Sequence, residues 1–231
     1  MALRIKIWGL KTAVAMAAAL EAGADDVGLV FFPPSPRDVT IEEAAGLAEI
    51  ARGRAGIVAL TVDADDALLQ RIAAEVRPDL LQLHGSETPE RVAQIRKRFG
   101  IPVMKAIKVA TREDAAVALD YSGIADLVLF DARAPKGAVL PGGNGVPFDW
   151  RALDDVKGRV AYMLSGGLTP ENVANAIRAT GATAIDVSSG VETSPGEKSA
   201  ARIDAFIKAA RAASPKPGDD AANQNYPEQD A

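Results

Sequence analysis

The chain has 231 residues, 48% of them hydrophobic, and carries a formal net charge of −5. Its length and apolar content predict one soluble domain with a large core, and its acidic balance offers no basic field to nucleic acid or an anionic membrane. Because it contains no cysteine and one histidine, a disulfide framework and a multi-histidine metal centre are both excluded.

The start of the sequence has no pattern of export or membrane insertion. Leu3–Ile7 alternates like a strand and does not resemble a signal peptide. No apolar run approaches the ~20 residues that span a bilayer. We therefore expect a cytoplasmic protein that acts on a small molecule, as a monomer or a homodimer.

Short apolar runs alternate with amphipathic stretches along the sequence. We predict strands at Arg4–Ile7, Val27–Phe31, Gly56–Thr61, Leu80–Leu83, Val103–Ile107, Leu127–Phe130, Val160–Leu164 and Ala184–Val187. Apolar residues three and four apart predict helices at Thr12–Ala22, Ile41–Ala51, Ala64–Val76, Pro89–Phe99, Arg112–Leu119, Asp149–Asp155, Thr169–Thr180 and Ala200–Ala212. Their expected N-caps include Thr12, Thr40, Thr88, Thr111 and Thr169. This alternation predicts an α/β fold, a single (β/α)8 TIM barrel that occupies residues 1–213.

Two segments interrupt this alternation. Ala132–Phe148 is rich in glycine and proline and is too long for an ordinary strand-to-helix loop. It follows a strand end, where barrel enzymes carry their sites, so we expect a mobile lid over the substrate. Residues 214–231 are polar, contain proline and lack periodicity, which predicts a disordered tail.

Two short turns follow the seventh and eighth predicted strands. Both combine glycine with serine, so backbone N–H groups can converge on an anion without interference from Cβ atoms. In (β/α)8 barrels the loops after these two strands are the usual place for a phosphate group. The residues expected to bind phosphate are Gly166, Gly167, Ser188, Ser189 and Gly190.

Other strand ends supply the candidates for chemistry. Asp131 ends a strongly apolar run, and the resulting desolvation favours the protonated form that a general acid needs. Arg37 offers a fork of donors to a carboxylate or phosphate, and His84 and Asp186 are further substrate-binding candidates. Structural roles remain open for each: a cap or loop contact for Asp131, an exposed loop position for Arg37, and backbone support for His84 and Asp186.

Several short motifs, taken in order, resemble phosphoribosylanthranilate isomerase, a barrel enzyme of tryptophan biosynthesis. The resemblance runs from residue 3 to about 211 through Lys6–Leu10, Val27–Phe32, Ser35–Arg37, Leu81–Gly85, Phe130–Asp131, Gly142–Gly145, Phe148–Trp150, Leu164–Val173 and Asp186–Glu192. It implies an Amadori rearrangement that needs no metal and no organic cofactor. The resemblance assigns the general acid to Asp131, the contact with the anthranilate carboxylate to Arg37, and the phosphate grip to the two turns.

One position departs from the family's pattern. The family has a cysteine as general base where this chain has Trp8, and the chain contains no cysteine. Indole nitrogen is only a donor, and general-base catalysis is typically worth about 10²–10⁴-fold. We therefore expect impaired turnover in an isomerase whose base was replaced. Two alternatives remain: a natural protein that uses His84 or Asp186 instead, and a catalytically silent barrel that binds phosphorylated ligands. Another phosphosugar-processing barrel is a further alternative.

Overall fold

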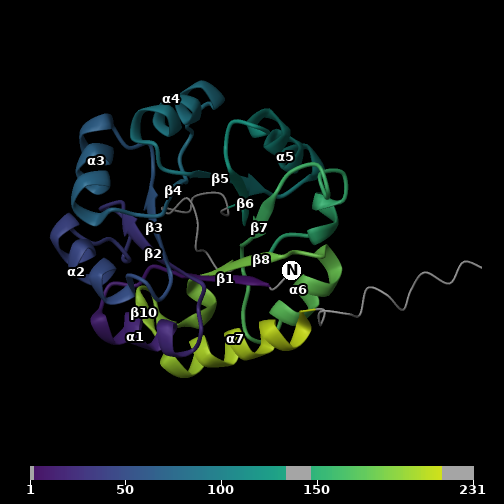
Figure 1. Ribbon diagram of the computed structural model, residues 1–231. Coiled ribbons are helices and arrows are strands. Elements are labelled where there is room, and N and C mark those ends of the chain that lie inside the picture. Colours follow the sequence, from purple (N-terminus) through teal and green to yellow (C-terminus); the bar gives the residue numbers. More distant parts are fainter. Residues whose placement is uncertain (1–2, 134–146, 215–231) are drawn as a thin grey trace, which may run out of the picture.

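A closed barrel of eight parallel strands forms the centre of the computed structural model, which describes residues 3–133 and 147–214 (Figure 1). The strands follow one another around the barrel in chain order, and β8 pairs with β1 to close it. They are β1 (Arg4–Trp8), β2 (Asp26–Phe31), β3 (Gly56–Thr61), β4 (Leu80–Leu83), β5 (Val103–Val109), β6 (Leu127–Ala132), β7 (Tyr162–Leu164) and β8 (Ala184–Val187). The predicted TIM barrel is confirmed.

Helices surround the barrel and cover the outer faces of its strands (Figure 1). The α-helices are α1 (Ala13–Glu21), α2 (Ile41–Ala51), α3 (Asp66–Arg71), α4 (Pro89–Phe99), α5 (Arg112–Ala116), α6 (Val173–Thr180) and α7 (Ala200–Ala213). Shorter helical turns are the π-helix η1 (Ile72–Val76) and the 3-10 helices η2 (Val117–Tyr121), η3 (Trp150–Leu153) and η4 (Ser189–Val191). A two-stranded antiparallel hairpin of β9 (Glu192–Ser194) and β10 (Glu197–Lys198) follows η4.

Several predicted boundaries were wrong. The helix expected at Asp149–Asp155 is only the 3-10 helix η3, and the one expected at Thr169–Thr180 begins at Val173. Its N-cap is Asn172, whose side chain accepts a hydrogen bond from the backbone N–H of Thr169 at 2.8 Å. The other predicted threonine caps are confirmed, because each accepts a hydrogen bond from an N–H in the first turn of its helix.

Residues of the strands alternate between two separate packing regions. Ile5 and Ile7 of β1 belong to the large core between strands and helices, whereas Lys6 and Trp8 do not. Because successive side chains of a strand point to opposite faces, Lys6 and Trp8 project into the barrel. An apolar layer seals the barrel interior and consists of Val58, Leu80, Met104, Ala106, Leu129, Met163 and Ala184.

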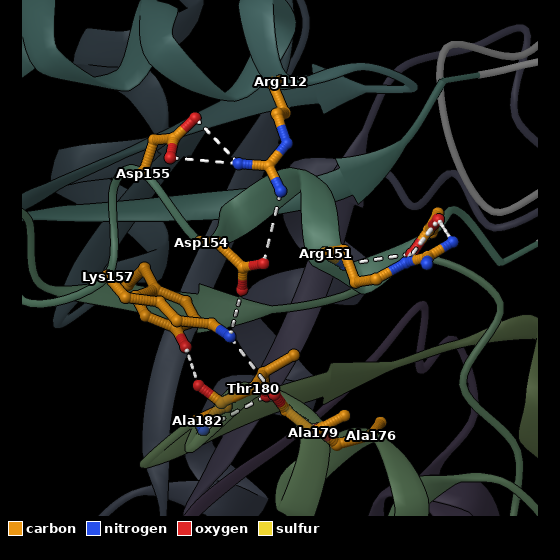
Figure 2. A network of polar contacts seen from close by, with 11 residues as sticks. Arg112, Arg151, Asp154, Asp155, Lys157, Ala176, Ala179, Thr180 and Ala182 are labelled. Atoms are coloured by element: carbon orange, nitrogen blue, oxygen red, sulfur yellow. Dashed lines mark hydrogen bonds and ion pairs between the residues drawn. The ribbon is translucent and has the colours of Figure 1, made fainter.

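A polar network on the outside of the barrel fixes the segment around η3 (Figure 2). Arg112, at the start of α5, donates to both carboxylate oxygens of Asp155 at 3.0 Å and to Asp154 at 3.4 Å. Lys157 donates to Asp154 at 2.8 Å and to the backbone carbonyl of Ala179 at 3.1 Å. These contacts join α5 to the end of α6 across η3.

Part of two predicted features lies outside the described residues. The predicted lid at Ala132–Phe148 is described only at its two ends, and the predicted tail only at Ser214. Both therefore stay predictions, as does the domain boundary at residue 213. Within the described ranges, no helix has the length and apolar character to cross a membrane.

Candidate active site

A pocket opens where the carboxyl ends of β6, β7, β8 and β1 meet. Its wall combines two carboxylates with the two predicted phosphate turns. The lining residues are Trp8, Asp131, Ser165, Gly166, Gly167, Leu168, Asp186, Val187, Ser188 and Ser189. Asp131 and Asp186 reach it because they alternate along their strands with Phe130 and Val187, which belong to the outer core.

Asp131 is buried at the edge of this pocket beside His84. Its Oδ1 accepts a hydrogen bond from the backbone N–H of Ala132 at 3.0 Å, and its Oδ2 lies 3.3 Å from His84 Nε2. Neither Oδ2 nor Nε2 has a hydrogen bond of good geometry to another described residue. Two buried polar atoms without partners are costly, so this pair is suited to a ligand that supplies the missing contacts.

A chain of polar side chains crosses the barrel beneath the pocket. Lys6 Nζ lies 3.0 Å from Asp186 Oδ1 and donates to Gln82 Oε1 at 2.5 Å. The Gln82 amide Nε2 lies 3.1 Å from His84 Nδ1, and the Ser165 hydroxyl donates to Asp186 Oδ2 at 3.1 Å. Burial raises the pKa of Asp186, and the neighbouring charge of Lys6 opposes that rise. These polar contacts thus connect Asp186 to Asp131 through Lys6, Gln82 and His84.

Arg37 lies beside the pocket and is held by a third buried carboxylate, Glu192 of β9. Arg37 Nε and one Nη donate to the two carboxylate oxygens of Glu192 at 2.8 Å and 2.7 Å. Lys198 of β10 donates to Glu192 at 2.6 Å and to the Ser188 hydroxyl at 2.8 Å. A cation therefore lies against the second phosphate turn.

The charges of this group shift one another's pKa. Burial raises the pKa of Glu192, but the hydrogen bond from Arg37 and the charge of Lys198 outweigh burial and leave the pKa at about 2. Burial lowers the pKa of Lys198 to about 8 against the opposing charge of Glu192. At neutral pH the group therefore holds two cations and one anion.

Glycine is required in both turns because backbone comes close there. A Cβ on Gly166, whose φ is +86°, would lie 2.3 Å from the backbone nitrogen of Ala132. A Cβ on Gly190 would lie 1.8 Å from the carbonyl oxygen of Leu168. Gly190 thus packs the second turn against the first, and the two turns form one wall.

Trp8 stands over the mouth of the barrel and packs against Val30 and Leu60. It is 5% exposed, its Nε1 has no hydrogen-bond partner among the described residues, and the Arg37 guanidinium lies 5.4 Å from its ring centroid. Gly28 gives the indole room, because a Cβ there would meet the Trp8 Cβ at 2.5 Å. The indole therefore lines the same pocket as Asp131 and Asp186.

All of the predicted site residues except His84, Arg37 and Gly190 line the pocket. His84 contacts Asp131, and Arg37 contacts Trp8 and Glu192, but neither lines the pocket. Sequence reasoning gave no site role to Lys6, Gln82, Glu192 or Lys198. A signal existed for Lys6 and Gln82, since each is a polar residue that interrupts an apolar strand.

The pocket's chemistry agrees with its position in the fold. Carboxylates and glycine turns gathered at the carboxyl ends of barrel strands define a (β/α)8-barrel enzyme. Among the described residues, no group of three or more His, Asp or Glu side chains is placed to hold a metal ion. The family model described as N-(5′-phosphoribosyl)anthranilate (PRA) isomerase matches residues 5–209. The chain belongs to this family.

Individual relatives agree with the family match. The chain is 59% identical over 212 residues to an N-(5′-phosphoribosyl)anthranilate isomerase from Rhodopseudomonas palustris strain BisA53, covering 92% of this chain and 97% of that protein. The crystal structure of phosphoribosyl anthranilate isomerase from Thermotoga maritima has a TM-score of 0.83 and 36% identity, over 91% of this chain and 99% of that one. Another structure, a complex with reduced 1-(o-carboxyphenylamino)-1-deoxyribulose 5-phosphate, has a TM-score of 0.80 and 34% identity, with the same coverage.

Proposed function

We propose that this chain catalyses the Amadori rearrangement of N-(5′-phosphoribosyl)anthranilate to 1-(2-carboxyphenylamino)-1-deoxyribulose 5-phosphate in tryptophan biosynthesis. The observation that carries the proposal is that Asp131 and both glycine turns open into one pocket in a chain of this family. The related structure that holds a reduced form of the product supports it. Such a pocket can bind a phosphate group at the glycine turns and can also protonate a sugar ring oxygen at Asp131.

The phosphate end of the substrate fits the two turns. Backbone N–H groups of Gly166, Gly167, Ser188 and Ser189 are the proposed ligands, because glycine geometry lets an anion approach the backbone closely. Lys198, in contact with the Ser188 hydroxyl, adds a positive charge beside this turn. This arrangement orients the ribose so that its reacting carbons face the carboxylates.

The reaction moves protons and bonding electrons only. Asp131 gives its proton to the ribose ring oxygen while the C1′–O bond breaks, which opens the ring to a Schiff base with the anthranilate nitrogen. A proton then leaves C2′, and the enolamine that forms becomes the ketone when C1′ gains a proton and the 2′-hydroxyl loses one. His84, 3.3 Å from Asp131, is placed to hold that carboxyl in position.

Trp8 occupies the place in which the family carries its general base, and we propose that it slows the reaction. Indole nitrogen donates but does not accept, so Trp8 cannot take the C2′ proton. Its ring also fills space at the barrel mouth. Arg37 stays the proposed contact for the anthranilate carboxylate, although Glu192 engages two of its three nitrogens, which leaves one Nη for the substrate.

Steady-state isomerisation, followed by anthranilate fluorescence, tests the proposal on the unsubstituted chain and on Trp8→Cys. We expect slow turnover by the unsubstituted chain and a kcat increased by about 10²-fold or more in Trp8→Cys, the lower end of what a general base supplies. If both proteins fold and bind inorganic phosphate yet neither produces ketone, the isomerase proposal is wrong and the silent phosphate-binding barrel is the better account. A cytoplasmic location and a monomeric or homodimeric state stay predictions.

A further inference from the structure

Asp131 and Asp186 are the two carboxylates among the residues that line the pocket. An aldose-to-ketose rearrangement needs one group that gives a proton to the ring oxygen and another that takes the proton from C2′. We propose that Asp186 is the proton acceptor in this chain. The proposal rests on the isomerase function and deepens it, because it assigns the step for which Trp8 has no suitable atom.

The surroundings of Asp186 fit a proton acceptor. Its side chain is 1% exposed and lines the same pocket as Asp131 and the phosphate turns. Its Oδ2 is held by the Ser165 hydroxyl at 3.1 Å. Its Oδ1 lies 3.0 Å from Lys6 Nζ but accepts no well-formed hydrogen bond from a described residue. One oxygen is thus fixed by the protein, and the other keeps a lone pair for a substrate proton.

Lys6 prepares the carboxylate for this task. A buried carboxyl without a cation would be neutral and could not accept a proton. Lys6, fully buried on the neighbouring strand and also bonded to Gln82, stabilises the ionised form. Burial at the same time makes the carboxylate a stronger acceptor than one in water. The ion pair and the desolvation together give a base that is both ionised and reactive.

Other polar groups near the pocket are less suitable. His84 Nδ1 is occupied by the amide of Gln82, and its Nε2 faces Asp131, so its ring contacts the acid and does not line the pocket. The hydroxyls of Ser165, Ser188 and Ser189 would themselves need a base before they could accept a proton. Asp186 needs no such help.

The step balances without a further reactant. The carboxylate of Asp186 takes the proton from C2′, the C–H electron pair forms the C1′=C2′ double bond, and the former C=N pair moves to the anthranilate nitrogen. Asp186 is then a carboxylic acid beside Lys6. Asp186 gives its proton to C1′, which regenerates its carboxylate. The 2′-hydroxyl proton goes to Asp131, which had given its own proton to the ring oxygen, and the ketone forms with both carboxyl groups back in their starting states.

Four proteins test the assignment: the unsubstituted chain, Asp186→Asn, Trp8→Cys and the double variant Trp8→Cys/Asp186→Asn. We expect Asp186→Asn to lower the kcat of the unsubstituted chain by about 10²-fold or more. In the Trp8→Cys background, where cysteine takes the C2′ proton, the same change should lower kcat by less than about 10-fold. Activity of the double variant also shows that the Asp186→Asn change permits folding.

A matched control, Asp26→Asn, shows how far kcat changes when a buried carboxylate that is not the proposed base is removed. Asp26 is also 1% exposed and pairs with Arg4, but it lies at the first residue of β2, at the opposite end of the barrel. Asp26→Asn should leave kcat within about 3-fold. If Asp186→Asn keeps kcat within the same margin, Asp186 is not the base.

Three further outcomes are distinguishable. If the unsubstituted chain produces no ketone above the Asp131→Asn background while Trp8→Cys is active, the isomerase function holds and the assignment of Asp186 as a working base is overturned. If neither protein is active although both fold, the proposed function itself fails. If Asp186→Asn lowers kcat equally in both backgrounds, Asp186 acts in structure or binding and not as the replaceable base.

Discussion

Arg37 and Glu192 are 155 residues apart in the sequence and are joined by two hydrogen bonds of 2.8 Å and 2.7 Å, both side chains being almost fully buried. The pair ties the loop after β2 to the hairpin after β8, and Arg37 carries the contact on to Trp8. The guanidinium is therefore positioned by the protein before any substrate arrives. Its orientation depends on a residue far along the chain.

Glu192→Gln should weaken substrate binding with little effect on the chemical step. A neutral amide cannot receive both donors of Arg37, and a hydrogen bond to a charged group is worth about 1.5–3 kcal/mol, which is roughly a 10- to 150-fold rise in KM. The matched control is Glu197→Gln in the same hairpin, since Glu197 is exposed and lies 3.6 Å from Lys11. Steady-state kinetics on both variants checks this, and a KM within about 2-fold for Glu192→Gln would contradict it.

The same carboxylate should make stability depend on pH in the acid range. The pKa of Glu192 is about 2 in the folded chain against 4.5 ordinarily, so its stabilising effect is complete above pH 4.5 and is lost as pH falls toward 2. Between pH 5 and pH 3 the advantage of the unsubstituted chain over Glu192→Gln in unfolding free energy should shrink by about 2 kcal/mol. Urea unfolding of both proteins at the two pH values measures this. An advantage that stays constant would show that Glu192 has an ordinary pKa.

Because of Lys198, we expect the affinity for the substrate phosphate to fall at alkaline pH. Burial lowers its pKa to about 8, so the ammonium in contact with the second phosphate turn becomes neutral as pH rises through 8. KM should therefore rise between pH 7 and pH 9.5. In Lys198→Arg the side chain stays charged throughout this range, and the rise should disappear. A pH profile of KM that is the same for both proteins would contradict the role of Lys198.

Gly190→Ala should damage the phosphate wall. The added Cβ would lie 1.8 Å from the carbonyl oxygen of Leu168, so one turn must move away from the other. We expect a loss of about 1–3 kcal/mol in unfolding free energy and weaker binding of inorganic phosphate. Gly46→Ala is the control, because this position in α2 has no atom within 4 Å of an added Cβ, and alanine there should stabilise by up to about 1 kcal/mol. Equal stability of the two variants would refute the close packing of the turns.

The strand pattern could be predicted closely because periodicity and burial act together in a parallel barrel. The strands Gly56–Thr61, Leu80–Leu83 and Ala184–Val187 have the predicted bounds, and each is an almost wholly buried apolar run. The predicted helix at Asp149–Asp155 failed for a physical reason. Asp155 accepts a hydrogen bond from Arg112 of α5, and Lys157 donates to the carbonyl of Ala179 in α6 (Figure 2). The Asp149 side chain accepts from the backbone N–H of Arg151. These polar side chains are engaged by neighbouring segments and do not extend the helix.

The site was predictable where residues lie at strand ends and much less so elsewhere. Asp131 and Asp186 share the inward-facing phase of their strands, so topology alone brings them to one pocket. Glu192 and Lys198 belong to a short hairpin of mostly polar residues, which no periodic pattern marks. Their importance comes from the burial of ions against Arg37, which depends on tertiary contacts between distant segments.

We expect this chain, with Trp8 in place, to isomerise its substrate. The most direct measurement is product formation in D2O, with the unsubstituted chain beside Asp131→Asn, analysed by mass spectrometry so that slow turnover is visible. We predict ketone from the unsubstituted chain, with deuterium at C1′ only to the extent that the proton held by Asp186 exchanges with D2O before it is returned, and a rate lower by about 10²-fold or more for Asp131→Asn, which lacks the acid. Equal, background-level product from both proteins would show that the chain with Trp8 is not a working isomerase.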